Sequence, residues 1–187
     1  MFKTATKFKF AATALVVSAS MILSSAAFAG KDGPNKNKER FKPGDQTIAQ
    51  IAAGGGFDTL VEALTCTGLV GAVANPAAEL TVFAPTDDAF DKLGLDKDNV
   101  CTTFDTETLS TILLYHVVAE RRPSPSVING MNKEIATLSP GNFLYPEGMG
   151  SLVIFANVND ASIEGADVLA SNGIIHIIDT VLLPFAP

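Results

Sequence analysis

The sequence has few of the side chains on which enzyme and metal sites are usually built. It contains only two histidines, His116 and His176, and only two cysteines. No serine lies in a Gly-x-Ser-x-Gly motif, and the glycines at 54–56 lack the Lys and the Ser or Thr of a phosphate-binding loop. Neither cysteine has a second Cys or a His at zinc-ligand spacing. We therefore predict a protein that is not an enzyme, with no metal and no other cofactor.

Positive charge is also scarce after the first part of the chain. Residues 43–187 contain five Lys or Arg and eighteen Asp or Glu, a formal charge of −13. Nucleic-acid binding depends mainly on the neutralisation of phosphates by Lys and Arg. The sequence therefore predicts no nucleic-acid partner.

A membrane-spanning segment is lacking as well. The apolar run at residues 11–22 is shorter than the ~20 residues that a spanning helix needs. It follows a lysine-containing start and leads to Ala27-Phe28-Ala29, the small-x-small pattern of a signal peptidase site. We predict a cleaved secretory signal peptide at 1–29, an extracellular or periplasmic location, and no stable membrane insertion of the mature protein.

The mature chain divides into an arm and one domain. Residues 30–44 carry five Lys or Arg and a single apolar residue, Phe41, which predicts a disordered basic arm. Residues 45–187 have the length of one ordinary domain. Because an exported chain with an even number of cysteines favours a disulfide, we predict a Cys66–Cys101 bond, with two free buried thiols as the alternative.

The order of the predicted elements indicates an α+β fold. Helical spacing dominates residues 46–74, whereas short β-type runs separated by turn residues dominate from residue 134 onward. Between them, residues 80–84 are apolar without a polar break, which predicts a strand buried on both faces. Pro85 ends this strand, and Thr86 is positioned to cap a following helix.

His116 and His176 both lie in apolar, strand-like surroundings. A lone histidine in such a place is more often a hydrogen-bonded core residue than a ligand or a catalyst. We hypothesise that His116 meets the polar helix start at Thr86 and Asp87, which would form a structural polar cluster inside the domain.

Three ordered blocks of the sequence resemble the fasciclin-like domain family. They are LTVFAPTDDAF at 80–90, LYHVV at 114–118, and ASNGIIHIID at 170–179 followed by VLLP at 181–184. The resemblance implies a wedge of two β-sheets with several helices packed on one side. It also implies a secreted binding or adhesion module whose partner is a protein or polysaccharide at a cell surface or in a matrix.

The resemblance also indicates candidate partner-binding residues. They are Tyr115 and His116 in the Tyr-His block, and Asp167, Val168 and Leu169 before the last block. The chain departs from the adhesive forms of the family at Gly165-Ala166, and it has no Arg-Gly-Asp. The alternative function is an envelope or stress protein that binds a small apolar ligand between the helices and the sheet.

Overall fold

The computed structural model describes residues 44–128, 134–148 and 152–185. The predicted signal peptide and residues 30–43 of the predicted arm lie outside the described residues. The helices are α1 (Ile48–Gly54), α2 (Asp58–Cys66), α3 (Val70–Ala74), α4 (Asp87–Asp91), α5 (Val100–Thr103), α6 (Thr106–Tyr115) and α7 (Ser124–Ile128). The strands are β1 (Leu80–Pro85), β2 (Val117–Val118), β3 (Ile135–Ala136), β4 (Phe143–Gly148), β5 (Leu152–Phe155), β6 (Asp160–Ala170) and β7 (Gly173–Ile178).

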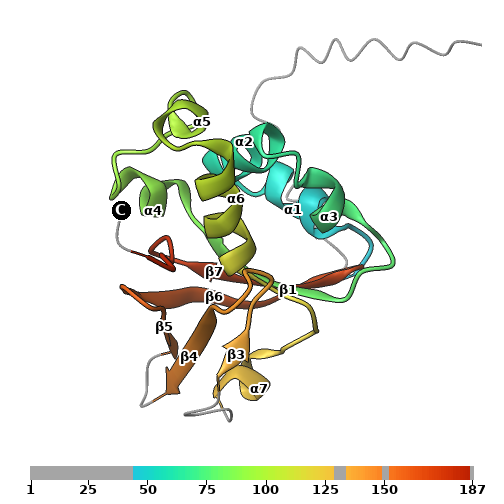
Figure 1. Cartoon of the computed structure of the whole chain (residues 1–187). Helices are drawn as coiled ribbons and strands as arrows, with labels where there is room; N and C mark the ends of the chain where they lie inside the picture. The colour runs from blue at the N-terminus through green and yellow to red at the C-terminus, as the bar shows by residue number, and fades with distance from the viewer. Residues whose placement is uncertain (1–43, 129–133, 149–151, 186–187) are drawn as a thin grey trace, which may run out of the picture. The chain divides into compact units, whose positions relative to one another are not determined.

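The described strands form one mixed sheet in the order β2-β1-β7-β6-β5-β4-β3. Only β1 and β7 pair in parallel, and every other pair is antiparallel. Helices α1 to α6 lie on one side of this sheet, and α7 lies beside β3 and β4 (Figure 1). The predicted α+β class and the helix layer on one side are therefore confirmed.

The expected pair of sheets is replaced by a single sheet, and the reason lies in β6. Its first three residues pair with β5, whereas Ile163, Gly165 and residues 168–170 pair with β7. Two register shifts bend the strand between Ile163 and Val168. The sheet also curls, so that its two edge strands, β2 and β3, come near each other. The Leu138 N–H, just after β3, donates to the Val117 carbonyl of β2, 2.7 Å away.

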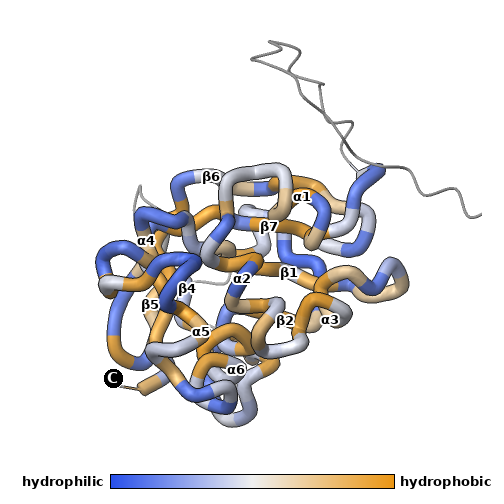
Figure 2. The backbone as a smooth tube through the Cα atoms, turned by 90° about the horizontal axis from the view of Figure 1, so that it is seen from above, coloured by the Kyte–Doolittle hydropathy of each residue, from blue (hydrophilic) through white to orange (hydrophobic). Residues whose placement is uncertain are grey.

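Strand β1 separates two apolar clusters, as its sequence predicts. All six of its residues are buried. Val82 and Ala84 face the cluster beneath the helices, whereas Phe83 belongs to a second cluster inside the curl of the sheet. Figure 2 shows the hydrophobic character of the neighbouring strand β7, which pairs with β1 along its whole length. The prediction of a strand buried on both faces is confirmed.

The turn between β6 and β7 forms at the predicted place, for a different reason from the one its sequence suggests. An Asn-Gly pair usually provides the positive φ angles of a tight hairpin. Here the connection is Ser171-Asn172, and Asp167 is the one described non-glycine residue with a positive φ. The Asn172 side chain instead donates to the carbonyl oxygens of Val73 and Asn75 and accepts from the Ile48 N–H.

The disulfide is present and joins two helices. Cys66 ends α2 and Cys101 lies in α5, with their Cα atoms 6.1 Å apart. The bond closes a loop between residues 35 positions apart. It holds the short helix α5, whose Val100 is fully buried, against α2.

Candidate partner-binding surface

Tyr115 lies inside the domain at the end of α6. Its side chain is 0% exposed; the hydroxyl donates to the Phe143 carbonyl at 2.9 Å and accepts from the Asn157 N–H at 3.0 Å. Burial raises the pKa of Tyr115, so the hydroxyl keeps the proton that it donates. The residue joins α6 to β4 and to the β5–β6 turn. The sequence-based prediction places Tyr115 on a partner-binding surface, whereas the structure described buries its ring.

His116 follows Tyr115 and is equally enclosed. Its Nδ1 donates to the Ile112 carbonyl at 2.7 Å, so its Nε2 is free to accept from the Leu182 N–H at 2.9 Å. Burial lowers the pKa of His116 to about 4, against the opposing effect of the Ile112 carbonyl. The expectation of a hydrogen-bonded core histidine is confirmed, whereas a direct role in partner binding is not compatible with its burial.

The hypothesised cluster of His116, Thr86 and Asp87 is not formed by direct hydrogen bonds. Both ring nitrogens of His116 already have backbone partners, and the Thr86 hydroxyl accepts from the Ala89 N–H as a helix cap. The two Asp87 oxygens accept from the N–H groups of residues 58 and 59. Asp87 therefore caps the start of α2, where Phe57 provides no side-chain cap.

The burial of His116 predicts a loss of stability in mild acid. Because its folded-state pKa lies below its unfolded value, the unfolded chain binds more protons as the pH falls from about 6.5 toward about 4. The free energy of unfolding, measured by urea titration, should fall by about 2 kcal/mol from pH 7 to pH 5 through this residue. The fall should be smaller in His116→Gln, and an identical fall in both proteins would contradict the assignment.

Asp167 is a structural residue of the bulged part of β6. Its φ is 59°, and its oxygens accept from the N–H and the hydroxyl of Ser124, which begins α7. Burial alone would raise the pKa of Asp167, but the two Ser124 hydrogen bonds and nearby His176 hold it below its ordinary value. Asp167 therefore caps α7 from another part of the chain.

His176 lies beneath Asp167 and is also a core residue. Its Nδ1 accepts from the Asp167 N–H at 3.3 Å and its Nε2 donates to the Arg122 carbonyl at 2.9 Å. The ring stacks on Phe83 with centroids 5.4 Å apart. Burial lowers the pKa of His176, opposed by the Arg122 carbonyl and by Asp167. Ser124, Asp167 and His176 do not form a catalytic triad, because the serine hydroxyl donates to the carboxylate and the imidazole is enclosed.

Asp167→Ala should destabilise the domain and open α7. Alanine removes both cap acceptors and tolerates a φ of 59° poorly, so a loss of about 2 kcal/mol is expected. Asp167→Asn should cost less, because Asn tolerates this φ and keeps one carbonyl oxygen. Urea unfolding measures the loss, and amide hydrogen exchange at Ser126 and Val127 reports the opening of α7. Equal effects of the two substitutions would contradict the assignment.

Leu169 is the predicted partner-binding residue that the structure displays. It is 46% exposed, whereas neighbouring Val168 packs against the cluster beneath the helices. The bulge at Asp167 lies just before both residues. The five candidates are thus divided: Tyr115 and His116 are buried, Asp167 and Val168 are half-buried, and Leu169 faces solvent.

Sequence reasoning missed the residues that hold this region together. Arg121 donates to the carbonyl oxygens of Ser171 and Gly173 and pairs with Glu79 at 2.9 Å. Asn157 donates to the Pro184 carbonyl. These contacts join segments far apart in the chain, and an isolated Arg or Asn in an irregular segment carries no periodic signal that would reveal them.

Small apolar cavities lie beneath the helices of the described domain, and Leu64 and Val73 line three of them. Two of the three reach β1, whereas the third lies among α1, α2 and α3. The first occupies about 30 Å³ and is lined by residues of α1, α2, α3, α6, β1, β2 and β7. Across the described ranges, no helix is long and apolar enough to cross a membrane. The same part of the chain contains no group of three or more His, Cys, Asp or Glu suited to a metal ion.

Together the structure describes a domain with one disulfide between two helices, a curled mixed sheet beneath a helix layer, and tyrosine and histidine side chains that serve the fold. Residues 55–184 match the fasciclin domain model. The chain belongs to the fasciclin domain family, a family of cell-surface and adhesion-associated modules.

Relatives occur in bacteria and animals. The chain is 38% identical to protein sll1483 of Synechocystis sp. over 140 residues, which cover 74% of this chain and 73% of that protein. It is 38% identical to the cell surface glycolipoprotein MPB83 of Mycobacterium bovis, covering 57% of this chain and 44% of MPB83. It is 36% identical to the transforming growth factor-beta-induced protein ig-h3 of Sus scrofa, covering 68% of this chain and 18% of that protein.

The fold also matches a solved structure, the FAS1 domain pair from the insect cell adhesion molecule fasciclin I. The TM-score is 0.63 at 20% sequence identity, with 75% of this chain and 51% of that chain covered. This likeness supports the fold, and the function of this chain has to be argued from its own surface.

Proposed function

We propose that the chain is a secreted or periplasmic binding and adhesion module, whose partner is a protein or polysaccharide at a cell surface or in a matrix. Family membership supports this class of function, and MPB83 is by name a cell surface protein. The disulfide is consistent with a location outside the cytoplasm. Export would depend on the predicted signal peptide at residues 1–29.

The exposure of Leu169 is the observation that carries this proposal. A large apolar side chain that is 46% exposed on a strand offers a contact for a partner. Its position is fixed, because Asp167 bonds to Ser124 and His176, and Arg121 bonds to the carbonyl oxygens of the β6–β7 turn. Because the backbone that carries Leu169 is already ordered, a partner does not have to order this segment when it binds. Asp167 and Val168 then contribute by holding Leu169 in place and by their own half-exposed surfaces.

The test compares the mature protein with Leu169→Asp. Fluorescently labelled protein is applied to intact cells of the producing organism and to a glycan array, and bound protein is measured. Leu169→Asp should reduce binding at least about 10-fold, since a charge in an apolar contact costs more than about 1.4 kcal/mol.

The matched control is Leu93→Asp, which introduces the same charge at another exposed leucine, with 39% exposure, after α4. It should leave binding unchanged. Unaltered binding by Leu169→Asp, or an equal loss in both variants, would show that this surface is not the contact.

The apolar cavities favour a second candidate function, the binding of a small apolar ligand between the helices and the sheet. Two of these cavities occupy about 30 Å³ each and hold no more than a water or two, so a ligand would have to displace α3. This short helix consists of small and medium residues and begins with Val70, which is 38% exposed.

A fluorescent polyene fatty acid tests this second candidate. Saturable binding by the mature protein, abolished in Ala52→Leu, would support it, because Ala52 lines two of the cavities. Ala166→Leu, on the exposed part of β6, is the control for added apolar volume. Absence of saturable binding, or equal binding by both variants, would exclude this function.

A further inference from the structure

The outer face of β4, β5 and β6 displays two aromatic side chains beside a carboxylate. Tyr145 pairs with Phe155 across β4 and β5, and Phe155 pairs with Asp160 across β5 and β6. The two aromatic residues are 36% and 38% exposed, and Asp160 is exposed. The adjacent row, which includes Ile154 and Ala161, is buried inside the curl. Side chains alternate between the faces of a strand, so Tyr145, Phe155 and Asp160 share the outer face.

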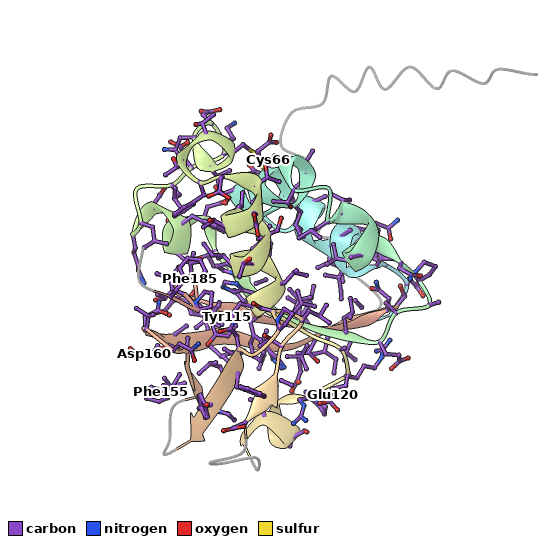
Figure 3. The ribbon with its side chains drawn as sticks, in the orientation of Figure 1. Cys66, Tyr115, Glu120, Phe155, Asp160 and Phe185 are labelled. Carbon is purple, nitrogen blue, oxygen red and sulfur yellow. A yellow bond between two sulfur atoms is a disulfide. The ribbon has the colours of Figure 1, made fainter. Side chains whose placement is uncertain are left out.

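No helix of the layer above the sheet covers this row. Figure 3 shows Phe155 and Asp160 at the side of the sheet away from α1 to α6. Cross-strand neighbours in an antiparallel pair lie about 5 Å apart, so the two rings form one continuous apolar surface. This surface, defined by Tyr145, Phe155 and Asp160, is called the outer aromatic row below.

The charge on this face is negative and uncompensated. Along β6, Asp160, Ser162 and Glu164 are exposed at alternate positions. The sequences of β4, β5 and β6 contain no Lys or Arg. Three ion pairs form among the described residues, and neither Asp160 nor Glu164 takes part in any of them. An anionic partner would be repelled here, whereas a cationic partner would find carboxylates available.

A surface of aromatic rings beside available carboxylates fits a cationic side chain of a partner. The face of a Tyr or Phe ring attracts the ammonium of Lys or the guanidinium of Arg, and a nearby carboxylate strengthens the contact. Asp160 and Glu164 are four residues apart in an extended strand, which places them ~13 Å from each other. An extended peptide with cationic side chains four residues apart has the same spacing.

We infer that the outer aromatic row, with Glu164, binds an extended Lys- or Arg-bearing segment of a partner protein. The inference deepens the proposed function, on which it rests, by giving the chemistry of the partner. The partner's cations lie over Tyr145 and Phe155 and pair with Asp160 and Glu164. The bound segment covers apolar area that otherwise faces water.

The binding of fluorescein-labelled peptides to the mature protein tests this inference, measured by fluorescence anisotropy at low salt. The probe is a twelve-residue alternating Lys-Thr peptide, and the comparison ligands are an alternating Glu-Thr peptide and labelled chitohexaose, a neutral glycan. The Lys-Thr peptide should bind, and the other two should bind at least about 10-fold more weakly. Phe155→Ala and Asp160→Asn should each weaken Lys-Thr binding about 5-fold.

Two control variants separate this face from diffuse electrostatic attraction. Asp98→Asn changes the net charge as Asp160→Asn does, but it lies in the exposed loop before α5. Leu93→Ala truncates an exposed apolar residue elsewhere. Both should change binding less than about 2-fold. The urea unfolding midpoint of each variant is measured. If the substitution at Phe155 changes this midpoint, a substitution at Tyr145 takes its place in the binding assay.

Three outcomes would overturn the inference. They are no binding of the Lys-Thr peptide by the wild type, equal weakening by Asp98→Asn and Asp160→Asn, and glycan binding as tight as peptide binding. If the cell-binding assay with Leu169→Asp succeeds while the peptide assay fails, the proposed function stands and the basic-segment partner is wrong. If cell binding fails while peptide binding behaves as expected, the outer aromatic row stands and the Leu169 contact is wrong.

Discussion

Replacing Gly173 with alanine is expected to lower the free energy of unfolding by at least about 3 kcal/mol, or to prevent folding. Gly173 is the first residue of β7 and pairs with Leu80 at the start of β1. A Cβ on residue 173 would overlap the carbonyl oxygen of Leu80 and lie 2.7 Å from Cδ1 of Ile48. The overlapped atom belongs to the backbone, so it cannot rotate away as a flexible side chain would.

The neighbouring hydrogen bonds prevent an easy adjustment. The Leu80 N–H donates to the Asn172 carbonyl at 3.1 Å, and β1 and β7 remain paired along six positions. A shift of Leu80 would therefore disturb the one parallel pair of the described sheet, which separates the two apolar clusters.

Urea unfolding monitored by circular dichroism measures this effect, with Gly71→Ala as the control. Gly71 lies in α3, and a Cβ there meets no atom within 4 Å. Alanine favours a helix by about 0.5–1 kcal/mol relative to glycine, so Gly71→Ala should be neutral or stabilising. A Gly173→Ala protein as stable as the wild type would show that the β1–β7 pair tolerates a wider spacing.

Replacing Asn172 with alanine is expected to lower the free energy of unfolding by about 4 kcal/mol. The Asn172 side chain is 0% exposed. Its Oδ1 accepts from the Ile48 N–H at 2.9 Å, and its Nδ2 donates to the carbonyl oxygens of Val73 and Asn75 at 2.8 and 2.9 Å. Alanine leaves one donor and two acceptors without partners in a buried place.

Asn172→Asp distinguishes hydrogen bonding from volume. An aspartate keeps the acceptor for Ile48 but places a carboxylate against two carbonyl oxygens, so it should be at least as damaging as alanine. The control is Asn99→Ala: Asn99 bonds to Asp96 and Gly94 at an exposed site, where water can replace it, and the loss should stay below about 1 kcal/mol. Equal losses at positions 172 and 99, by urea unfolding, would contradict the role of Asn172.

Both predictions concern the Ser171-Asn172-Gly173 turn, where sequence pattern and physical reason differ. The pattern indicates a tight turn, and a turn is present. The asparagine is required for buried contacts to residues 97 to 124 positions away, and the glycine is required for a close approach to β1. The local sequence contains the residue types of a tight turn. The packed structure shows the distant contacts for which the asparagine and the glycine are needed.

The sequence alone determined the features that depend on neighbours in the chain. The apolar run at 80–84 predicted a strand buried on both faces, and β1 is such a strand. Thr86 was predictable as a helix cap because its hydroxyl and the Ala89 N–H that donates to it are only three residues apart. The order of helical and strand patterns gave the α+β class, and two cysteines in a chain predicted to be exported gave the disulfide. The family blocks gave membership of the fasciclin domain family.

Only the tertiary structure decided the roles of the polar residues and the surface that is displayed. Tyr115 and His116 bond to partners up to 66 positions away, and Asp167 caps a helix 43 positions earlier in the chain. Such pairings depend on how the sheet curls, which a local pattern does not encode. The same curl buries one side of β4 to β6 and leaves the outer aromatic row facing solvent, because residues that alternate along a strand lie on opposite faces.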